Sequence, residues 1–134
     1  MGVATIIIII ANILFSYKGF TNNLFFEGYR FDIEKILVYK DYKRIITSAF
    51  LHANWTHLVL NMVTLFLFSG ALENYVGAFQ FLLIYFAGLI GGELLSLFIH
   101  RNHPDYTSIG ASGAIAGIVF ASIALMPGMN IGFI

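Results

Sequence analysis

The chain has 134 residues, of which 59% are hydrophobic and 10% charged, and its formal net charge is zero. This composition excludes an ordinary soluble domain, and the absence of a basic excess argues against nucleic acid as a partner. The chain has no cysteine, which also excludes disulfides and thiol nucleophiles. We therefore expect an integral membrane protein that lies in a lipid bilayer.

Four apolar segments predict a bundle of four transmembrane helices. A helix needs about 20 apolar residues to cross the hydrocarbon core. The segments that approach or exceed this length are 2–17, 58–72 with an N-terminal extension from residue 45, 76–99 and 109–126. Segment 2–17 lacks the basic flank and the cleavage site of a signal peptide, so we expect it to be retained as the first span.

The apolar character resumes after Pro127 and Gly128, at residues 129–134. This pattern predicts the start of a fifth span and a natural product that is longer than the present sequence. No internal repeat or low-complexity linker interrupts the chain. We therefore expect residues 1–134 to form a single all-α, polytopic membrane domain that is incomplete at its C-terminus.

The connection 18–44 between the first two predicted spans holds six of the seven Lys and Arg residues and four of the seven acids. Within it, apolar and charged side chains alternate along residues 31–40. The pattern favours a long first loop that lies partly in the membrane interface. A solvated loop with some apolar content is the alternative.

Small residues recur at every fourth position in the last two predicted spans. The two sets are Gly88, Gly92 and Ser96, and Gly113, Gly117 and Ala121. Such spacing predicts a close-packing face on each helix. We expect the face of the fourth span to require a helix from beyond residue 134, and to remain an open groove without it.

Gly110, Ala111, Ser112 and Gly113 lie where the apolar character resumes after a polar loop. A serine at a loop-to-helix junction is a candidate nucleophile, because unpaired helical amides can receive the oxyanion that forms when a carbonyl is attacked. Ordinary packing of small residues between membrane helices is the alternative for this tetrapeptide.

His57 and Asn61 are four residues apart at the start of the second predicted span, so they share one helix face. Polar side chains at this depth indicate either a functional site or an interhelical hydrogen bond that stabilises the bundle. For His52, nearer the interface, we expect a structural hydrogen bond to the preceding loop. His100 and His103 lie in the polar loop 100–108 without further ligands, so we expect no metal and no cofactor.

Two rival proteolytic chemistries are not supported. The zinc motif HExxH does not occur, and Asp32, Asp41 and Asp105 all lie in predicted loops rather than in spans. Serine remains as the nucleophile. For Glu73 and Glu93, which lie in spans, we expect structural hydrogen bonds, with a gating role for Glu93 as a lesser alternative.

Together these residues resemble the rhomboid family of intramembrane serine proteases. The matching stretches keep the family's order and spacing over residues 44–117, and they are RIITSAFLH at 44–52, NWTHLVLNM at 54–62, GALE at 70–73 and GASG at 110–113. The resemblance implies that Ser112 is the nucleophile, at the floor of a water-filled cavity, and that His57 and Asn61 stabilise the oxyanion together with the amide of Ser112. It also implies a large first loop at 18–44.

One departure concerns the general base. The family's base is a histidine on a sixth span, which the present sequence does not reach, so we expect the 134 residues alone to be inactive. The resemblance also places loops 18–44 and 100–108 on the non-cytoplasmic side, although the Lys and Arg residues of the first loop would favour the cytoplasm.

Three functions are compatible with these features. The first is a serine endopeptidase that cleaves peptide bonds in or near the transmembrane segments of membrane protein substrates, most simply in the plasma (inner) membrane. The second is an inactive rhomboid-like protein that binds or escorts membrane clients, and the third is a small transporter or channel. Retention of Ser112 with His57 and Asn61 favours the first, because a protein that only binds has no chemical need for these three residues together.

Overall fold

The computed structural model describes residues 2–126 of the chain. Three of its helices are long and apolar enough to cross a membrane: α1 (Val3–Thr21), α5 (Trp55–Val76) and α6 (Ala78–Ile99). The fourth apolar helix, α7 (Ser112–Leu125), has 14 residues. The predicted helical membrane bundle is therefore confirmed, while the predicted start of a fifth span lies outside the described residues.

Two positions set the bounds of α5. Asn54 caps its N-terminus, where Oδ1 accepts a hydrogen bond from the backbone N–H of His57 at 2.9 Å. Gly77 ends the helix in the left-handed region, with φ +91°, and α6 begins directly after it. The predicted extension of this span back to residue 45 is wrong, because residues 44–50 form the separate short helices α4 (Arg44–Thr47) and η1 (Ser48–Phe50).

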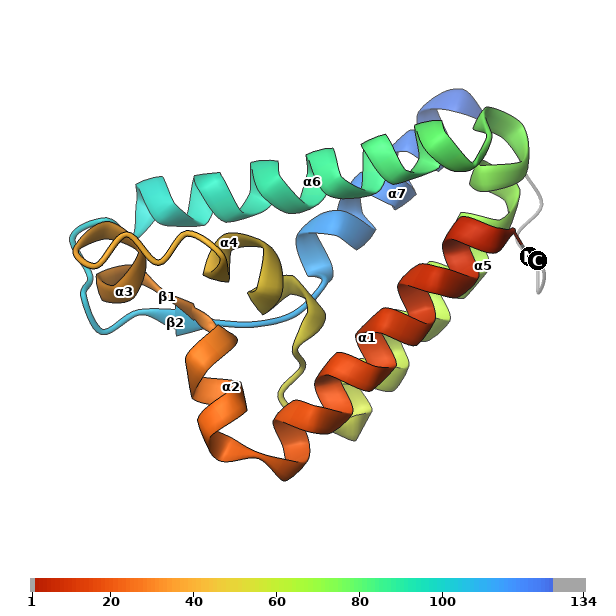
Figure 1. Ribbon diagram of the computed structural model, residues 1–134. Helices are drawn as coiled ribbons and strands as arrows, with labels where there is room; N and C mark the ends of the chain where they lie inside the picture. Colours follow the sequence, from red (N-terminus) through yellow and green to blue (C-terminus); the bar gives the residue numbers. More distant parts are fainter. Residues whose placement is uncertain (1, 127–134) are drawn as a thin grey trace.

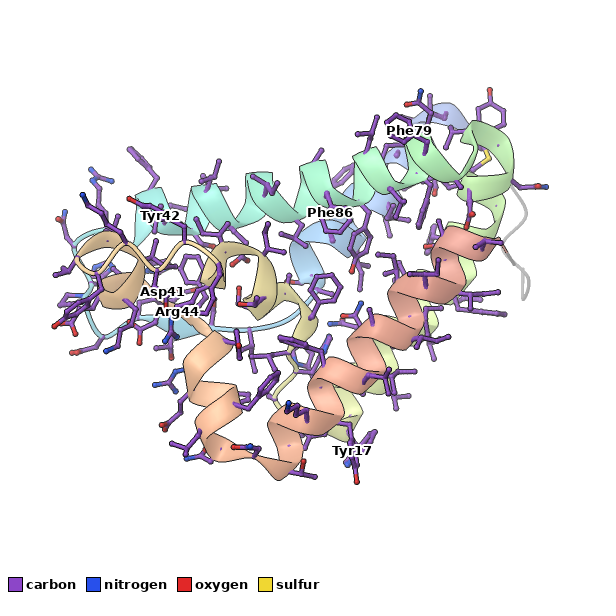
Figure 2. The ribbon with its side chains drawn as sticks, viewed as in Figure 1. Tyr17, Asp41, Tyr42, Arg44, Phe79 and Phe86 are labelled. Atoms are coloured by element: carbon purple, nitrogen blue, oxygen red, sulfur yellow. The ribbon has the colours of Figure 1, made fainter. Side chains whose placement is uncertain are left out.

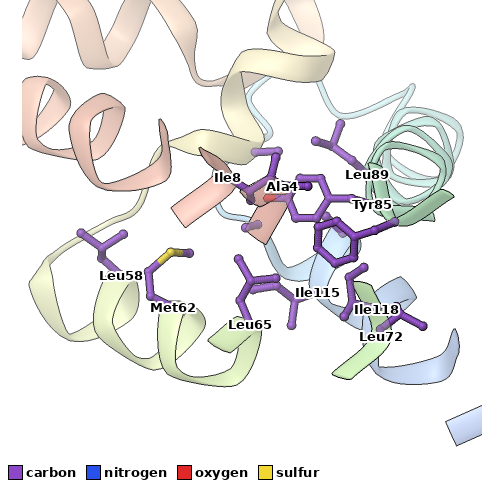
Figure 3. Close-up of a cluster of buried hydrophobic side chains, with 14 residues drawn as sticks. Ala4, Ile8, Leu58, Met62, Leu65, Leu72, Tyr85, Leu89, Ile115 and Ile118 are labelled. Atoms are coloured by element: carbon purple, nitrogen blue, oxygen red, sulfur yellow. The ribbon is translucent and has the colours of Figure 1, made fainter. Parts of the chain in front are cut away.

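Helices α1 and α5 run side by side, and α6 crosses the molecule with α7 against it (Figure 1). The buried core lies where these four helices meet (Figure 3). Its fully buried side chains include Leu65 of α5, Tyr85 of α6 and Ile118 of α7. The Tyr85 hydroxyl also accepts a hydrogen bond from Nδ2 of Asn12, at 3.3 Å, which joins α1 to α6.

The two stripes of small residues pack against each other in antiparallel register. A Cβ atom at Gly88 would lie 3.0 Å from the Gly113 carbonyl oxygen and 3.3 Å from the Cα of Gly117. A Cβ atom at Gly92 would lie 3.4 Å from the Cα of Gly113. The predicted close-packing faces are confirmed, but the predicted open groove on α7 is wrong, because α6 itself occupies the face that carries Gly113 and Gly117.

The connection 18–44 is folded rather than a simple loop. It contains the end of α1, then α2 (Asn23–Tyr29), β1 (Phe31–Asp32) and α3 (Ile33–Leu37). Phe31, Ile33 and Ile36 are buried in a second small core, so these three apolar side chains face protein and not lipid. The expectation that these three residues lie in the membrane interface is therefore wrong. The neighbouring residues Leu37, Val38 and Tyr39 are exposed and can form an interfacial surface.

A two-residue antiparallel ladder joins β1 to β2 (Thr107–Ser108), with Phe31 opposite Ser108. It brings the connection 18–44 together with the loop that precedes α7. These two loops therefore lie at the same end of the bundle, as expected for the first and third connections of a helical membrane protein.

Candidate active site

Ser112 is the first residue of α7, and its side chain is exposed. Ala111 occupies the N-cap position and offers no side-chain hydrogen bond to the first turn. Within residues 2–126 the first amides of the helix thus have no capping side chain, and they carry the partial positive charge of a helix N-terminus. The serine hydroxyl thus lies at the loop-to-helix start that the sequence indicated, beside groups that can stabilise an anion.

Gly110 brings the segment before Ser112 against the imidazole of His57. Its backbone is in the left-handed region, with φ +113°. A Cβ atom on Gly110 would lie 2.9 Å from Cε1 and 3.2 Å from Nε2 of His57, so an added side chain would force the His57 ring to shift. His57 is 55 positions away from Ser112 in the sequence. In the structure its ring nevertheless contacts Gly110, which comes two positions before Ser112.

The hydrogen bond at the other ring nitrogen determines where His57 carries its proton. Nδ1 accepts from the backbone N–H of Ala53 at 3.3 Å. A nitrogen that accepts has no proton, so in the neutral ring the proton is on Nε2. Since Nε2 is the nitrogen near Gly110, His57 can donate a hydrogen bond toward the segment that carries Ser112.

Asn61 lies one turn after His57 on α5. Its amide nitrogen Nδ2 is buried and has no hydrogen-bond partner among residues 2–126. An unpaired buried donor is costly, and an amide of this kind can be satisfied by an oxygen that arrives from a ligand. An interhelical hydrogen bond that only stabilises the bundle would give Nδ2 a partner on another helix. Among residues 2–126 no such partner is present, so the Asn61 amide can donate to a ligand.

His52 is fully buried and lies edge-on to His57, with ring centroids 4.9 Å apart. Ser16 of α1 donates its hydroxyl to the Phe50 carbonyl oxygen at 2.8 Å, and its oxygen lies 2.9 Å from Nδ1 of His52. Because the single hydroxyl proton is used on Phe50, Nδ1 of His52 is the donor in that pair. His52 thus makes a structural hydrogen bond, but its partner is Ser16 of α1 and not the preceding loop as expected. Ser16 in turn bonds to Phe50, which lies in that preceding segment.

Burial, together with a smaller effect of the neighbouring His57, lowers the pKa of His52 from 6.5 to about 4. His52 is therefore neutral at physiological pH. This leaves its Nε2 unprotonated, buried and without a hydrogen-bond partner in the described structure.

The remaining histidines, His100 and His103, lie in the loop after α6. Their Nδ1 atoms are 3.3 Å apart, and the ring of His100 stacks on Tyr106. No group of three or more potential metal ligands occurs among residues 2–126. The packing on Tyr106 gives His100 a role in the loop beside β2.

The buried Arg44, at the start of α4, holds the parts of the first loop together (Figure 2). Nε of Arg44 donates to Oδ2 of Asp41 at 2.7 Å, and Nη1 donates to the carbonyl oxygens of Glu27 and Arg30 at 2.9 Å each. Hydrogen bonds from Lys43 and Arg44 hold the pKa of Asp41 below its usual value. Arg44 thus fixes α2 against α4, directly before Ser48.

Both membrane carboxylates make the structural hydrogen bonds that were expected. Glu73 accepts from the N-terminal turn of α1, from the backbone N–H groups of Ala4 and Thr5. Glu93 accepts from the Ser48 hydroxyl at 3.0 Å. Ser48 was not singled out by sequence reasoning, because a serine in a short helix carries no pattern of its own. Its membership of the stretch 44–52 was the one available indication.

The family model for the rhomboid domain matches residues 39–133. Rhomboid-like protease 3 of Toxoplasma gondii is 43% identical over 76 residues, which are 57% of this chain and 28% of that protein. Rhomboid protease AarA of Providencia stuartii is 36% identical over 95 residues, 62% of this chain and 34% of that protein.

Mitochondrial rhomboid protein 1 of Saccharomyces cerevisiae is 36% identical over 106 residues, which are 74% of this chain and 31% of that protein. The chain thus spans about a third of the length of the curated relatives that it matches. The family model covers more than half of the chain and the structure has the expected apolar helices. This chain is therefore an integral membrane protein and belongs to the rhomboid family.

Proposed function

We propose that this chain is part of a serine endopeptidase that cleaves peptide bonds in or near the transmembrane segments of membrane protein substrates. The observation that carries the proposal is the contact between the His57 ring and Gly110, two residues before Ser112. It combines a proton-bearing ring nitrogen with an exposed hydroxyl at a helix start. Relatives such as AarA, which is named a rhomboid protease, support the same reaction class.

In the proposed reaction, Oγ of Ser112 attacks the carbonyl carbon of the scissile peptide. The bond between Oγ and carbon forms, and the carbonyl oxygen becomes an oxyanion. Nε2–H of His57, the Nδ2 amide of Asn61 and the backbone N–H of Ser112 donate to that oxygen. The peptide C–N bond then breaks, the amine leaves with a proton, and water hydrolyses the acyl-enzyme.

The hydroxyl proton of Ser112 needs a base. His57 is poorly suited to this role, because its Nδ1 is engaged by Ala53 and its Nε2 already carries a proton. His52 is buried and bonded to Ser16. We therefore assign the base to a histidine outside residues 2–126, as the rhomboid resemblance implies.

The conformation of the substrate should determine which segments are cleaved. A helical substrate hides its carbonyl groups in its own hydrogen bonds, so a segment with helix-breaking residues would be cleaved most readily.

The plasma membrane is the proposed compartment. The mitochondrial relative in yeast is evidence that the family is not restricted to it.

The decisive experiment uses the full-length product of the coding sequence and a transmembrane reporter substrate. Ser112→Ala should abolish cleavage, and a serine-directed fluorophosphonate should label the wild-type protein but not the variant. Ser122→Ala is a matched control, because this buried serine donates within its own helix to the carbonyl of Ile118. Undiminished cleavage by Ser112→Ala would refute the assignment. Client binding without cleavage would favour the escort protein.

A further inference from the structure

Ser48 is the residue at which α6 meets the segment in front of Ser112. Its hydroxyl donates to Oε2 of Glu93 on α6 at 3.0 Å, and its carbonyl oxygen accepts from the backbone N–H of Gly110 at 3.0 Å. Ser48 is 1% exposed, so water has little access to either bond. One buried residue therefore links a carboxylate of a membrane-spanning helix to the glycine that contacts His57.

Gly110 is a sensitive point for such a link. Its φ of +113° and its contact with the His57 ring leave little room for displacement. A shift of Gly110 would displace the imidazole of His57, which it contacts, or would displace Ser112, to which it is joined through Ala111. The hydrogen bond from Gly110 to Ser48 thus helps to fix the separation between the proposed oxyanion donor and the proposed nucleophile.

The other side of Ser112 is also held by α6. Gly113 packs directly on Gly92, where a Cβ atom would lie 3.4 Å from the Cα of Gly113. Gly92 is the chain neighbour of Glu93. Helix α6 therefore holds the residue after the serine by direct packing, and the segment before it through Ser48.

The chemical nature of Glu93 also requires an explanation. An ionisable side chain within a membrane-spanning helix is costly and usually faces the protein. Glu93 is only partly exposed, and Ser48 is its hydrogen-bond partner within residues 2–126. The Ser48 hydroxyl is buried and needs an acceptor, and the side-chain oxygen of Glu93 provides it.

We propose that Glu93 is a positioning residue that acts through Ser48 on Gly110, and so sets the geometry of His57 and Ser112. This inference rests on the proposed function. Glu93 would not touch the substrate. It would hold η1 and the segment before the serine in the one arrangement in which the oxyanion donors and the hydroxyl converge.

A double-mutant cycle in the full-length protein tests this coupling. Glu93→Ala and Ser48→Ala should each lower kcat about tenfold, because small displacements of catalytic groups have large effects on rate, while KM changes little. The double variant should be no slower than the slower single variant. Glu93→Gln, which keeps an acceptor for the Ser48 hydroxyl, should regain most of the activity. Glu34→Ala, which removes an exposed carboxylate from α3, is the matched control and should be silent.

Two results would overturn the proposal. Additive losses in the double variant would mean that Glu93 acts independently of Ser48. A lower melting temperature with an unchanged kcat per folded molecule would mean that Glu93 only stabilises the bundle.

A second measurement separates this inference from the proposed function. Amide hydrogen exchange at Gly110, followed by NMR in detergent micelles, should accelerate in Glu93→Ala and in Ser48→Ala but not in Glu34→Ala. Unchanged exchange at Gly110 would overturn the coupling even if the enzyme is active. A wild-type protein that cleaves no reporter would overturn the proposed function, and the exchange at Gly110 would still decide whether Glu93 holds this segment.

Discussion

Thr5 donates both its hydroxyl and its backbone N–H to Oε1 of Glu73, at 2.7 and 2.8 Å. The second carboxylate oxygen accepts from the N–H of Ala4 at 2.9 Å. Glu73 lies 68 residues away, near the end of α5, yet it provides the N-terminal cap that the first helix does not find in its own sequence, since Gly2 offers no side chain. The first and second spans are thus joined at the end of the molecule opposite to the candidate site (Figure 1).

We predict that Glu73→Ala lowers the stability of the bundle by about 2 kcal/mol or more, because it leaves buried amide donors at the start of α1 without a partner. Thr5→Val removes one bond and should cost about 1 kcal/mol. Thermal unfolding in detergent measures both. Asn74→Ala, at the exposed neighbouring position, is the control. Equal stabilities of Glu73→Ala and the wild type would contradict the capping role.

Gly110→Ala should reduce turnover strongly while the protein remains folded. The added Cβ atom meets Cε1 of His57 at 2.9 Å, and φ of +113° is strained for alanine. We expect a loss in kcat of at least about tenfold, since the donor and the nucleophile would be forced apart. Gly91→Ala on α6 makes the same chemical change where a Cβ atom meets no neighbour within 4 Å. Activity in Gly110→Ala equal to that of Gly91→Ala would show that the contact is unimportant.

His57→Ala and Asn61→Ala should each slow cleavage by roughly 10²-fold, the usual loss when one oxyanion donor is removed. Substrate binding should change less than turnover, because these donors act on charge that develops in the transition state. Steady-state kinetics with kcat and KM determined separately provide the measurement. If either variant instead unfolds in detergent and its folded fraction turns over normally, the residue serves as an interhelical contact.

The burial of His52 predicts an acid-dependent loss of stability. Its pKa is about 4 in the folded chain and 6.5 when exposed, so the unfolded state binds the additional proton between these values. Stability should therefore be constant above about pH 6.5 and should fall as the pH decreases toward 4, by up to roughly 3 kcal/mol. Unfolding measured across this range should show less acid sensitivity in His52→Gln. The same change at the exposed His103 should retain the full sensitivity, and an unaltered pH profile in His52→Gln would contradict the assignment.

Several features could be predicted from the sequence because they depend on composition and on local order. Hydrophobicity over about 20 residues determines which segments can cross a bilayer, so α1 and α6 were located closely. The position of Ser112 at a helix start follows from the polar loop before it and the apolar run after it. The depth of Glu73 and Glu93 in apolar segments required hydrogen bonds inside the protein, and both are present.

Tertiary structure decided the features that depend on which surfaces meet. The sequence shows that α7 carries small residues, but only the fold shows that they pack on Gly88 and Gly92 of α6. Likewise, the apolar residues Phe31 and Ile36 fit an interfacial loop equally well until the β1–β2 ladder gives them a core of their own. Helical periodicity specifies which face a residue is on, but not which partner covers that face.

In the candidate site, too, the sequence predicts the local features and the tertiary structure decides the long-range contacts. Four-residue spacing was enough to place His57 and Asn61 on one face of α5, because the helical repeat is fixed by backbone geometry. The contact of His57 with Gly110, and the hydrogen bond from Gly110 to Ser48, join segments that are far apart in the chain. Such contacts form only when α5, α6 and α7 have packed, since it is the packing of whole helices that brings their ends and loops together.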